Sequence, residues 1–170
     1  MHLKERDLHE ACTFVITLGV IFIALYFALL PLVPWWQRVV AQTIQVSLQW
    51  VGVDSTLVES PFVGLNANGK DIEISFACLG LVEFLLLAGA MIASRGFSNE
   101  HKVKGIVFGA LGLFVFNEFR IVFSILTILN SPVEFAEIVH GVLFRAFLFI
   151  VLAGFYRAWV NNAPKGPVAA

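Results

Sequence analysis

Three side chains with the chemistry of acyl transfer lie in apolar stretches of this sequence: Cys78, Arg120 and His140. A cysteine attacks as its thiolate, and a histidine that titrates near neutral pH is the usual base for that thiol. A fixed guanidinium in a low-dielectric cleft can stabilise the negative charge that develops on a carbonyl under attack. The three residues therefore predict a catalytic set, with Cys78 as nucleophile, His140 as proton carrier and Arg120 at the oxyanion.

Each of these residues also has a structural interpretation. A cysteine in a membrane helix is commonly a small hydrophobic residue. Arg120 can pair with Glu83 or Glu137 inside a helix bundle. A lone intramembrane histidine can serve as an interhelical hydrogen-bonding group. The sequence proposes the catalytic set, and its geometry must decide between these interpretations.

The composition indicates that a membrane surrounds these residues. Of 170 residues, 59% are hydrophobic and 14% are charged, and the mean hydropathy is +0.86, outside the range of soluble globular domains. A span needs about 20 apolar residues. We therefore expect residues 1–170 to form one all-α integral membrane domain. Its four transmembrane helices should lie at about residues 12–33, 76–93, 105–129 and 135–160.

The distribution of basic residues predicts the orientation. Basic residues flank the expected spans on one side, at Lys4, Arg6, Arg95, Lys102, Lys104, Arg157 and Lys165. The opposite side carries Arg38 and Lys70 in a much longer segment. Because short cytoplasmic loops are enriched in basic residues, we expect both termini in the cytoplasm and residues 34–75 outside.

The outer segment, residues 34–75, has two patterns. Arg38, Gln42, Gln45 and Gln49 recur opposite Trp36, Val40, Ile44 and Leu48, which predicts an amphipathic helix on the membrane surface. Further on, STLVES and KDIEIS alternate apolar and polar residues, with Asn68 and Gly69 as a turn signal between them. These patterns predict a small β-hairpin that leads into Cys78.

Ionisable residues at membrane depth mark functional sites by default, because they are costly to insert. The expected second to fourth spans contain Glu83, Glu118, Arg120, Glu137, His140 and Arg145. Asn117, Arg120, Ser124 and Thr127 are spaced three, four and three apart, so they form one polar stripe on the third span. We expect a water-accessible cleft along this stripe in the outer half of the membrane, and a structural ion pair for Arg145 with Glu83 or Glu118.

Other classes of site and partner are not expected. Cys12 and Cys78 begin different spans and should lie at opposite membrane faces, too far apart for a disulfide. No His, Cys and carboxylate residues cluster at metal-ligand spacing, so we expect neither a metal nor a cofactor. With a net charge of -1 and no basic tail, the chain has no feature of a nucleic-acid partner.

Three stretches resemble the signature helices of the exosortase/archaeosortase family: SFACLGLVEFLLLAGAMIA, LFVFNEFRIVFSIL and FAEIVHGVLFRAFLF. They place Cys78 before Leu-Gly, Arg120 after Asn117, and His140 before Gly, in the order of that family. The resemblance covers residues 55–160, and the short N-terminal part is similar to compact members such as exosortase H.

The resemblance implies a plasma-membrane cysteine transpeptidase or peptidase that acts on secreted proteins with a C-terminal tripartite sorting signal. Cys78 would form an acyl-enzyme, His140 would move protons and Arg120 would stabilise the oxyanion or orient the thiolate. The acyl group would pass to an acceptor, with a membrane lipid or glycolipid as one possibility, and Asn117 and Glu137 would support the site. Two alternatives stay open: a small ion or proton transporter subunit, in which the intramembrane charges line a path, and a membrane scaffold without chemistry.

Overall fold

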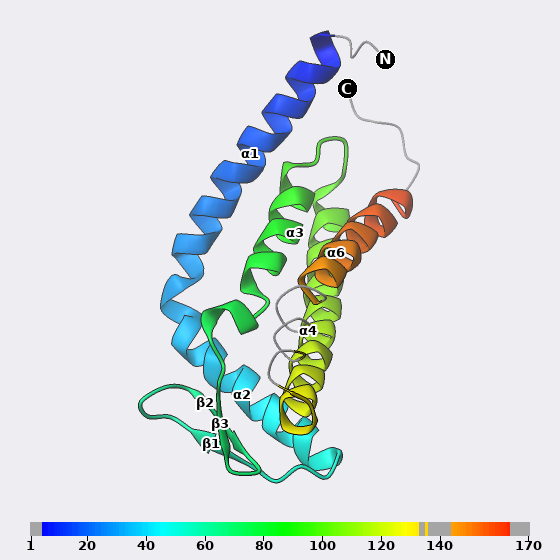
Figure 1. Cartoon of the computed structure of the whole chain (residues 1–170). Coiled ribbons are helices and arrows are strands. Elements are labelled where there is room, and N and C mark those ends of the chain that lie inside the picture. Colours follow the sequence, from blue (N-terminus) through cyan, green and yellow to red (C-terminus); the bar gives the residue numbers. More distant parts are fainter. Residues whose placement is uncertain (1–4, 133–134, 136–143, 164–170) are drawn as a thin grey trace.

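The computed structural model describes residues 5–132, 135 and 144–163. It is mostly helical, with a small three-stranded sheet (Figure 1). The elements are α1 (Glu5–Leu29), the 3-10 helix η1 (Leu30–Leu32), α2 (Val33–Trp50), β1 (Ser55–Val58), β2 (Gly64–Ala67), β3 (Lys70–Glu73), the 3-10 helix η2 (Phe76–Cys78), α3 (Leu81–Ala93), α4 (Asn99–Asn130) and α6 (Phe144–Asn161).

Two helical stretches among the described residues are long and apolar enough to cross a membrane, Leu8–Trp50 and Asn99–Asn130. The helices Leu81–Ala93 and Ala146–Asn161 are apolar but shorter. At about 1.5 Å per residue, the 13 residues of α3 reach about 20 Å, less than the hydrocarbon thickness of about 30 Å. The expected four spans therefore stay a prediction.

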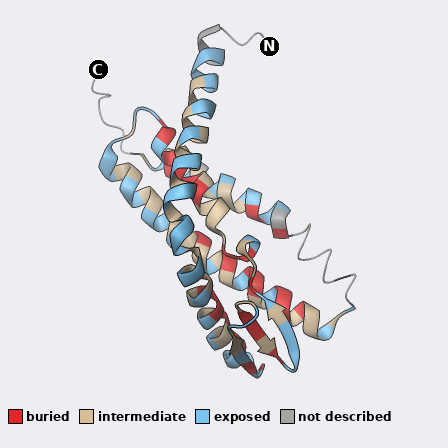
Figure 2. Ribbon diagram, turned by 90° about the vertical axis from the view of Figure 1, so that its left-hand side faces the viewer, coloured by how far each residue is buried: buried red, intermediate tan, exposed pale blue. Residues whose placement is uncertain are grey.

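The outward faces of the long helices are apolar. On α1, Val15, Ile16, Val20 and Phe27 are each more than 60% exposed. On α4, exposed apolar side chains recur at helical spacing, at Val103, Val107, Phe108, Leu111, Val115, Phe119 and Phe123. Apolar surface of this extent is rare on soluble monomers and is typical of a surface that contacts lipid or another protein. Figure 2 shows these faces as largely exposed, while buried residues concentrate in the interior of the bundle and around the sheet.

Helix α2 is confirmed, but its apolar face packs against protein. Val40, Ala41, Ile44 and Leu48 are fully buried. They belong to a core cluster that also contains Leu65 and Ala67 of β2 and Ile121 and Ile125 of α4. The amphipathic pattern therefore reports a helix that covers the sheet and the end of α4, and not one whose apolar face enters the lipid.

The predicted β-hairpin is wrong in its pairing, because a third strand lies between the two expected ones. β1 pairs with β2, and β2 pairs with β3, both antiparallel. The Asn68-Gly69 turn is confirmed, with positive φ at both residues, but it joins β2 to β3. β2 escaped the sequence analysis because GLNA is four residues long and does not alternate, being buried at Gly64, Leu65 and Ala67.

The two ends of the molecule differ in charge. The sheet and α2 lie at one end, and the start of α1 and the α3–α4 connection lie at the other (Figure 1). In residues 34–75, at the sheet end, two basic residues stand against four acidic ones: Arg38 and Lys70 against Asp54, Glu59, Asp71 and Glu73. Near the other end lie the basic residues Arg95, Lys102, Lys104 and Arg157, together with the acidic residues Glu10 and Glu100. The asymmetry has the sign expected if the sheet end faces away from the cytoplasm.

Candidate active site around Cys78

Cys78 lies in residues 74–80, which join β3 to α3 and are called the cysteine segment below. The sequence predicted that a helix would begin near residue 76, but η2 ends at Cys78 and α3 begins at Leu81. The break is at Gly80, whose φ of 66° lies in the left-handed region that other L-residues rarely adopt. The cysteine therefore lies at the end of a single 3-10 turn, before the break at Gly80, and not on a regular α-helix.

Helix α4 supplies two side-chain donors to this backbone. Asn117 Nδ2 donates a hydrogen bond of 2.8 Å to the carbonyl oxygen of Cys78. Arg120 Nη2 donates one of 3.3 Å to the carbonyl oxygen of Ala77. Asn117 and Arg120 are 2% and 3% exposed, and the Asn117 bond is fully buried while the Arg120 bond is partly buried. The structure thus brings Arg120 against the residue that precedes Cys78, 43 positions away in the sequence.

Helix α2 supplies two more donors from the opposite side. Trp36 Nε1 donates to the carbonyl oxygen of Leu79 at 3.3 Å. Gln37 Nε2 donates to the carbonyl oxygen of Ile74 at 3.0 Å. The cysteine segment is therefore held by side chains of two helices, and the donors Trp36 and Asn117 are about 80 residues apart in the sequence.

The remaining carbonyl groups of the segment accept bonds from backbone. Ser75, Phe76 and Gly80 accept from the N–H groups of Cys78, Leu79 and Phe84, respectively. With the four side-chain donors, each carbonyl from residue 74 to residue 80 has a partner. Irregular backbone in an apolar environment persists where its polar groups are satisfied in this way. Four side chains therefore stabilise the conformation of this one short segment.

The thiol of Cys78 lies at the edge of the core. Cys78 is 7% exposed, and its sulfur is 3.5 Å from the Ser75 hydroxyl. Its neighbours in the core cluster include Ile121 and Ile125 of α4. Both cysteines are free thiols, with Cys12 exposed and Cys78 buried. The Ser75 hydroxyl is the polar group that the structure sets beside the sulfur.

Gly80 has a steric role as well as a conformational one. A Cβ atom at this position would lie 3.1 Å from Cγ of Asn117, a closer approach than ordinary packing allows. The absence of a side chain at Gly80 therefore lets Asn117 reach the Cys78 carbonyl.

The polar stripe on α4 is confirmed as a single buried face, but the water-accessible cleft predicted along it is wrong. Asn117, Arg120, Ser124 and Thr127 are all between 2% and 8% exposed. The Ser124 and Thr127 hydroxyls donate to carbonyl oxygens four residues earlier in α4, those of Arg120 and Phe123. The stripe is therefore packed against protein, and the hydroxyl groups of Ser124 and Thr127 find their hydrogen-bond acceptors within α4 itself.

Several predicted site residues lie outside the described residues. His140 and Glu137 are among them, and the side chain of Arg145 is not described either. The distance from Cys78 to His140 therefore stays a prediction. Glu118, one of the two partners expected for Arg145, accepts a hydrogen bond of 2.8 Å at Oε1 from the Thr43 hydroxyl of α2.

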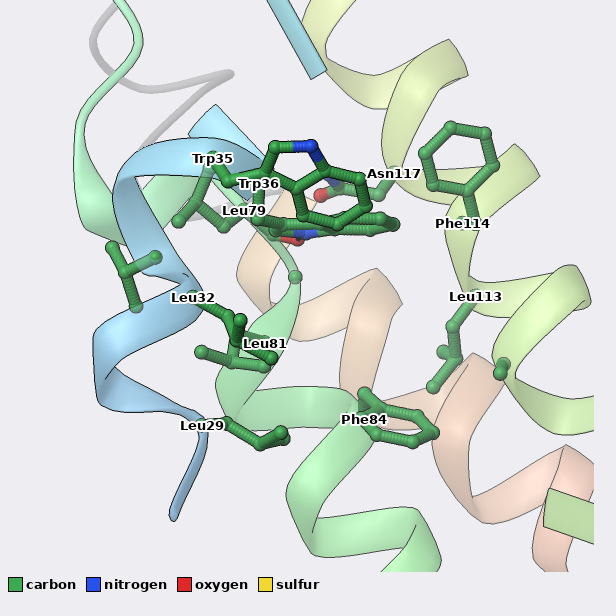
Figure 3. Close-up of a pocket in the computed structure, with 13 residues that line it drawn as sticks. Leu29, Leu32, Trp35, Trp36, Leu79, Leu81, Phe84, Leu113, Phe114 and Asn117 are labelled. Atoms are coloured by element: carbon green, nitrogen blue, oxygen red, sulfur yellow. Dashed lines mark hydrogen bonds between the residues drawn. The ribbon is translucent and has the colours of Figure 1, made fainter. Parts of the chain in front are cut away.

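A cavity of about 240 Å³ adjoins the cysteine segment. Figure 3 shows Leu29, Leu32 and Leu81 on one side and Leu113 and Phe114 of α4 on the other. Its remaining lining residues are Val33, Trp35, Trp36, Leu79, Gly80, Phe84, Ala110 and Asn117. The two residues that follow Cys78 therefore form part of its wall, and Asn117 is its most polar lining side chain.

Trp36 and Gln37 were not predicted as site residues. The sequence pattern places Trp36 on the apolar face of a surface helix, and the Pro-Trp-Trp-Gln sequence contains no signal for a contact with residues 74–79. Tryptophan has one N–H group that usually finds a partner when buried, which is the physical signal that was available. Which carbonyl it would meet depends on the tertiary fold.

The described residues contain no group of three or more His, Cys, Asp or Glu side chains that could hold a metal. Comparison with known proteins does not identify the chain: no family model matches the sequence, and no curated protein or solved structure matches it significantly. The site must therefore be interpreted from its own geometry.

Proposed function

We propose that this protein is a membrane cysteine peptidase or transpeptidase of the exosortase/archaeosortase type, with Cys78 as its nucleophile. The observation that carries the proposal is the cysteine segment: α4 directs Asn117 and Arg120 onto the carbonyl groups of Cys78 and Ala77. A cysteine with a merely packing role could sit on a regular helix. Here irregular backbone is fixed by buried polar side chains, an arrangement typical of functional sites.

In the proposed reaction, the Cys78 thiol transfers its proton to His140 and its sulfur attacks the scissile carbonyl. The Arg120 guanidinium stabilises the oxyanion of the tetrahedral intermediate. The intermediate collapses with cleavage of the C–N bond, and the departing amine takes the proton from His140. The resulting thioester is resolved by water or by an acceptor hydroxyl or amine, which releases the Cys78 thiol.

We propose a multi-pass location in the plasma membrane, with both termini in the cytoplasm and the cysteine segment toward the outer face. The basic residues at the α3–α4 end, and the presence of only two basic residues in the longer segment 34–75, support this orientation. The site then lies where secreted proteins anchored in the same membrane can reach it. Such proteins, with a C-terminal sorting signal, are the proposed substrates, and a membrane lipid or glycolipid is a proposed acceptor.

The test is processing in cells that express a secreted protein with a C-terminal tripartite signal. Its mass is followed with the wild-type protein and with Cys78→Ala, Arg120→Ala and His140→Ala. Cys12→Ala is the matched control, because Cys12 is a free and exposed thiol far from the segment in sequence. Membrane levels of every variant are measured alongside.

We expect the mass shift with the wild-type protein and Cys12→Ala, and its loss with the other three variants at unchanged membrane levels. Trapping of the acyl-enzyme as a hydroxylamine-sensitive adduct would further identify the thioester. Processing that survives Cys78→Ala would refute the proposal and favour the transporter or scaffold alternatives.

A further inference from the structure

The cavity beside the cysteine segment contains one unused polar group. Asn117 is 2% exposed, and its Oδ1 atom has no hydrogen-bond partner among the described residues. The orientation of this amide is fixed, because Nδ2 must be the atom that donates to the Cys78 carbonyl. Asn117 also lines the cavity, and in Figure 3 its side chain reaches from α4 toward Trp36 and Leu79.

A buried acceptor without a partner costs free energy that a hydrogen-bond donor in the cavity would recover. The rest of the lining restricts what can carry that donor. Among the described residues it contains no charged side chain, and leucine, valine, phenylalanine and tryptophan dominate it. The volume of about 240 Å³ exceeds that of a cavity of about 150 Å³ that accommodates benzene. The complementary ligand is an uncharged, bulky apolar group next to an N–H or O–H donor.

We propose that this cavity is a substrate subsite that takes a large apolar side chain next to the scissile bond, while a neighbouring peptide N–H donates to Asn117 Oδ1. This inference rests on the proposed function and adds the class of residue that the enzyme selects. Leu79 and Gly80 form part of the wall, so a side chain in the cavity would hold its own backbone beside the residues that follow Cys78.

A peptide fits these observations better than a lipid does. The cavity is lined by one amide side chain, that of Asn117, among apolar residues. An extended peptide presents an N–H group beside each side chain, which a lipid chain does not. Occupation would also act on Cys78. The amide that receives the substrate through Oδ1 is the one that holds the Cys78 carbonyl through Nδ2, so binding fixes the cysteine segment.

The first test measures binding without chemistry. Trp35 and Trp36 line the cavity, and bromine quenches indole fluorescence at short range. The full chain in detergent is titrated with N-acetyl-4-bromophenylalaninamide. The control titration uses methyl 2-acetoxy-3-(4-bromophenyl)propanoate, the matched ester that has no N–H donor. We expect saturable quenching by the amide and binding of the ester that is about five-fold weaker or more. 12-Bromododecanol serves as the lipid-like probe.

Two neighbouring residues of α4 provide matched variants. Ala110 lines the cavity, whereas Leu111 is 59% exposed and does not line it. Ala110→Phe should fill the cavity and abolish saturable quenching, and Leu111→Phe should leave it unchanged. The processing assay compares two substrates that differ only in the residue beside the scissile bond, which is large and apolar in one and alanine in the other. Ala110→Phe should slow cleavage of the first substrate about ten-fold more than cleavage of the second.

The outcomes separate this inference from the proposed function. Cys78→Ala should bind the amide probe as tightly as the wild-type protein, because binding needs no thiol. If processing requires Cys78 but the amide gives no saturable quenching, or bromododecanol alone gives it, the subsite is refuted and the proposed function stands. If Ala110→Phe blocks binding but leaves substrate preference unchanged, the subsite is also refuted. If the amide binds and processing survives Cys78→Ala, the proposed function fails and the role in cleavage fails with it.

Discussion

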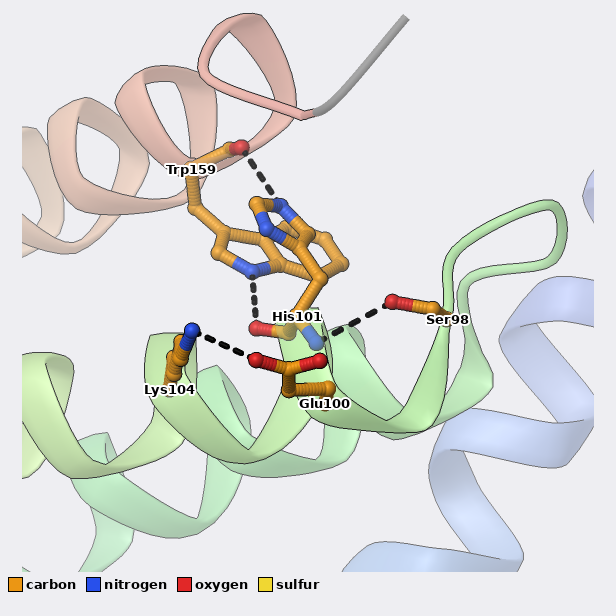
Figure 4. A network of polar contacts seen from close by, with 5 residues as sticks. All are labelled: Ser98, Glu100, His101, Lys104 and Trp159. Carbon is orange, nitrogen blue, oxygen red and sulfur yellow. Dashed lines mark hydrogen bonds and ion pairs between the residues drawn. The ribbon is translucent and has the colours of Figure 1, made fainter. Parts of the chain in front are cut away.

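Helix α4 makes one polar contact in its first turn and another just past its middle, and the two contacts differ in what they hold. At its N-terminal end, Trp159 Nε1 of α6 donates to the His101 carbonyl at 3.1 Å. His101 Nε2 lies 3.1 Å from the Trp159 carbonyl, and the two rings stack at 5.0 Å (Figure 4). This contact joins one regular helix to another and is reciprocal. Asn117 and Arg120 instead hold irregular backbone around a cysteine.

The difference separates a structural contact from a candidate site. In the His101–Trp159 contact, each residue both contributes a ring atom and offers a carbonyl to the other. At the cysteine segment, donors from two helices bind the carbonyl groups of one irregular stretch of backbone. Asn117 Oδ1 has no partner there among the described residues. A fold that only needed to join helices would use the first arrangement, since an unused buried acceptor reduces stability.

The largest expected effect is that of Gly80→Ala. The alanine must adopt a left-handed conformation, which costs about 1–2 kcal/mol, and its Cβ would lie 3.1 Å from Cγ of Asn117. Gly96→Ala is the matched control, because Gly96 has φ of 81° but open space around it. Thermal unfolding in detergent should show a larger loss for Gly80→Ala, and processing should be lost with that variant. Equal losses would contradict the proposed contact with Asn117.

Asn117→Ala comes next. It leaves the buried Cys78 carbonyl without its donor, a change that costs about 1–3 kcal/mol in free energy of unfolding. The control is Asn130→Ala, because Asn130 Nδ2 also donates to a backbone carbonyl but is exposed. Denaturation in detergent should separate the two variants by at least 1 kcal/mol. If they are equally stable, the Asn117 bond does not hold the segment.

A pair of tryptophan variants compares the two contacts directly. Trp36→Phe and Trp159→Phe each remove one indole donor to a backbone carbonyl and keep an aromatic ring. Each should lower stability by about 0.5–1.5 kcal/mol. Only Trp36→Phe should also reduce the rate of processing, measured as substrate mass against time. A similar rate loss with Trp159→Phe would mean that the activity follows stability alone.

The smallest effect is expected at the surface. Lys104 Nζ pairs with Glu100 Oε1 at 2.6 Å, one turn apart on α4, with both side chains more than 60% exposed. Because exposed pairs contribute little and are screened by salt, Lys104→Ala should leave the unfolding temperature and processing unchanged at 0.15 M salt. A marked loss of either would indicate a partner for Lys104 outside the chain.

The sequence predicted the elements with regular patterns. The helical character of α1, α2 and α4, the Asn68-Gly69 turn and the single polar face of α4 each follow from periodicity or from a local turn signal. The short strand β2 was missed because it has four residues, three of them buried, and shows no alternation. The sequence predicted water beside the polar stripe, which is instead buried by protein. Periodicity shows that residues share one face of a helix, but it does not show which other segments cover that face.

The candidate site was predictable in its residue types but not in its contacts. Cys78 and Arg120 were identified from chemistry and family resemblance, and the structure places Arg120 on the carbonyl of Ala77. The roles of Trp36, Gln37 and Gly80 depend on which segments meet in space. Asn117 was expected to support the site, but its bond to Cys78 could not be derived from spacing along α4.

The positions of these donors in the chain set the order in which the site can form during synthesis. Trp36 and Gln37 precede the cysteine segment, but Asn117 follows Cys78 by 39 residues. At about 5–20 residues per second, the ribosome needs about 2–8 seconds to add those residues. During that interval the carbonyl of Cys78 lacks its α4 donor. The Cys78 thiol is therefore made before its site exists, and it acquires its fixed surroundings only when α4 docks.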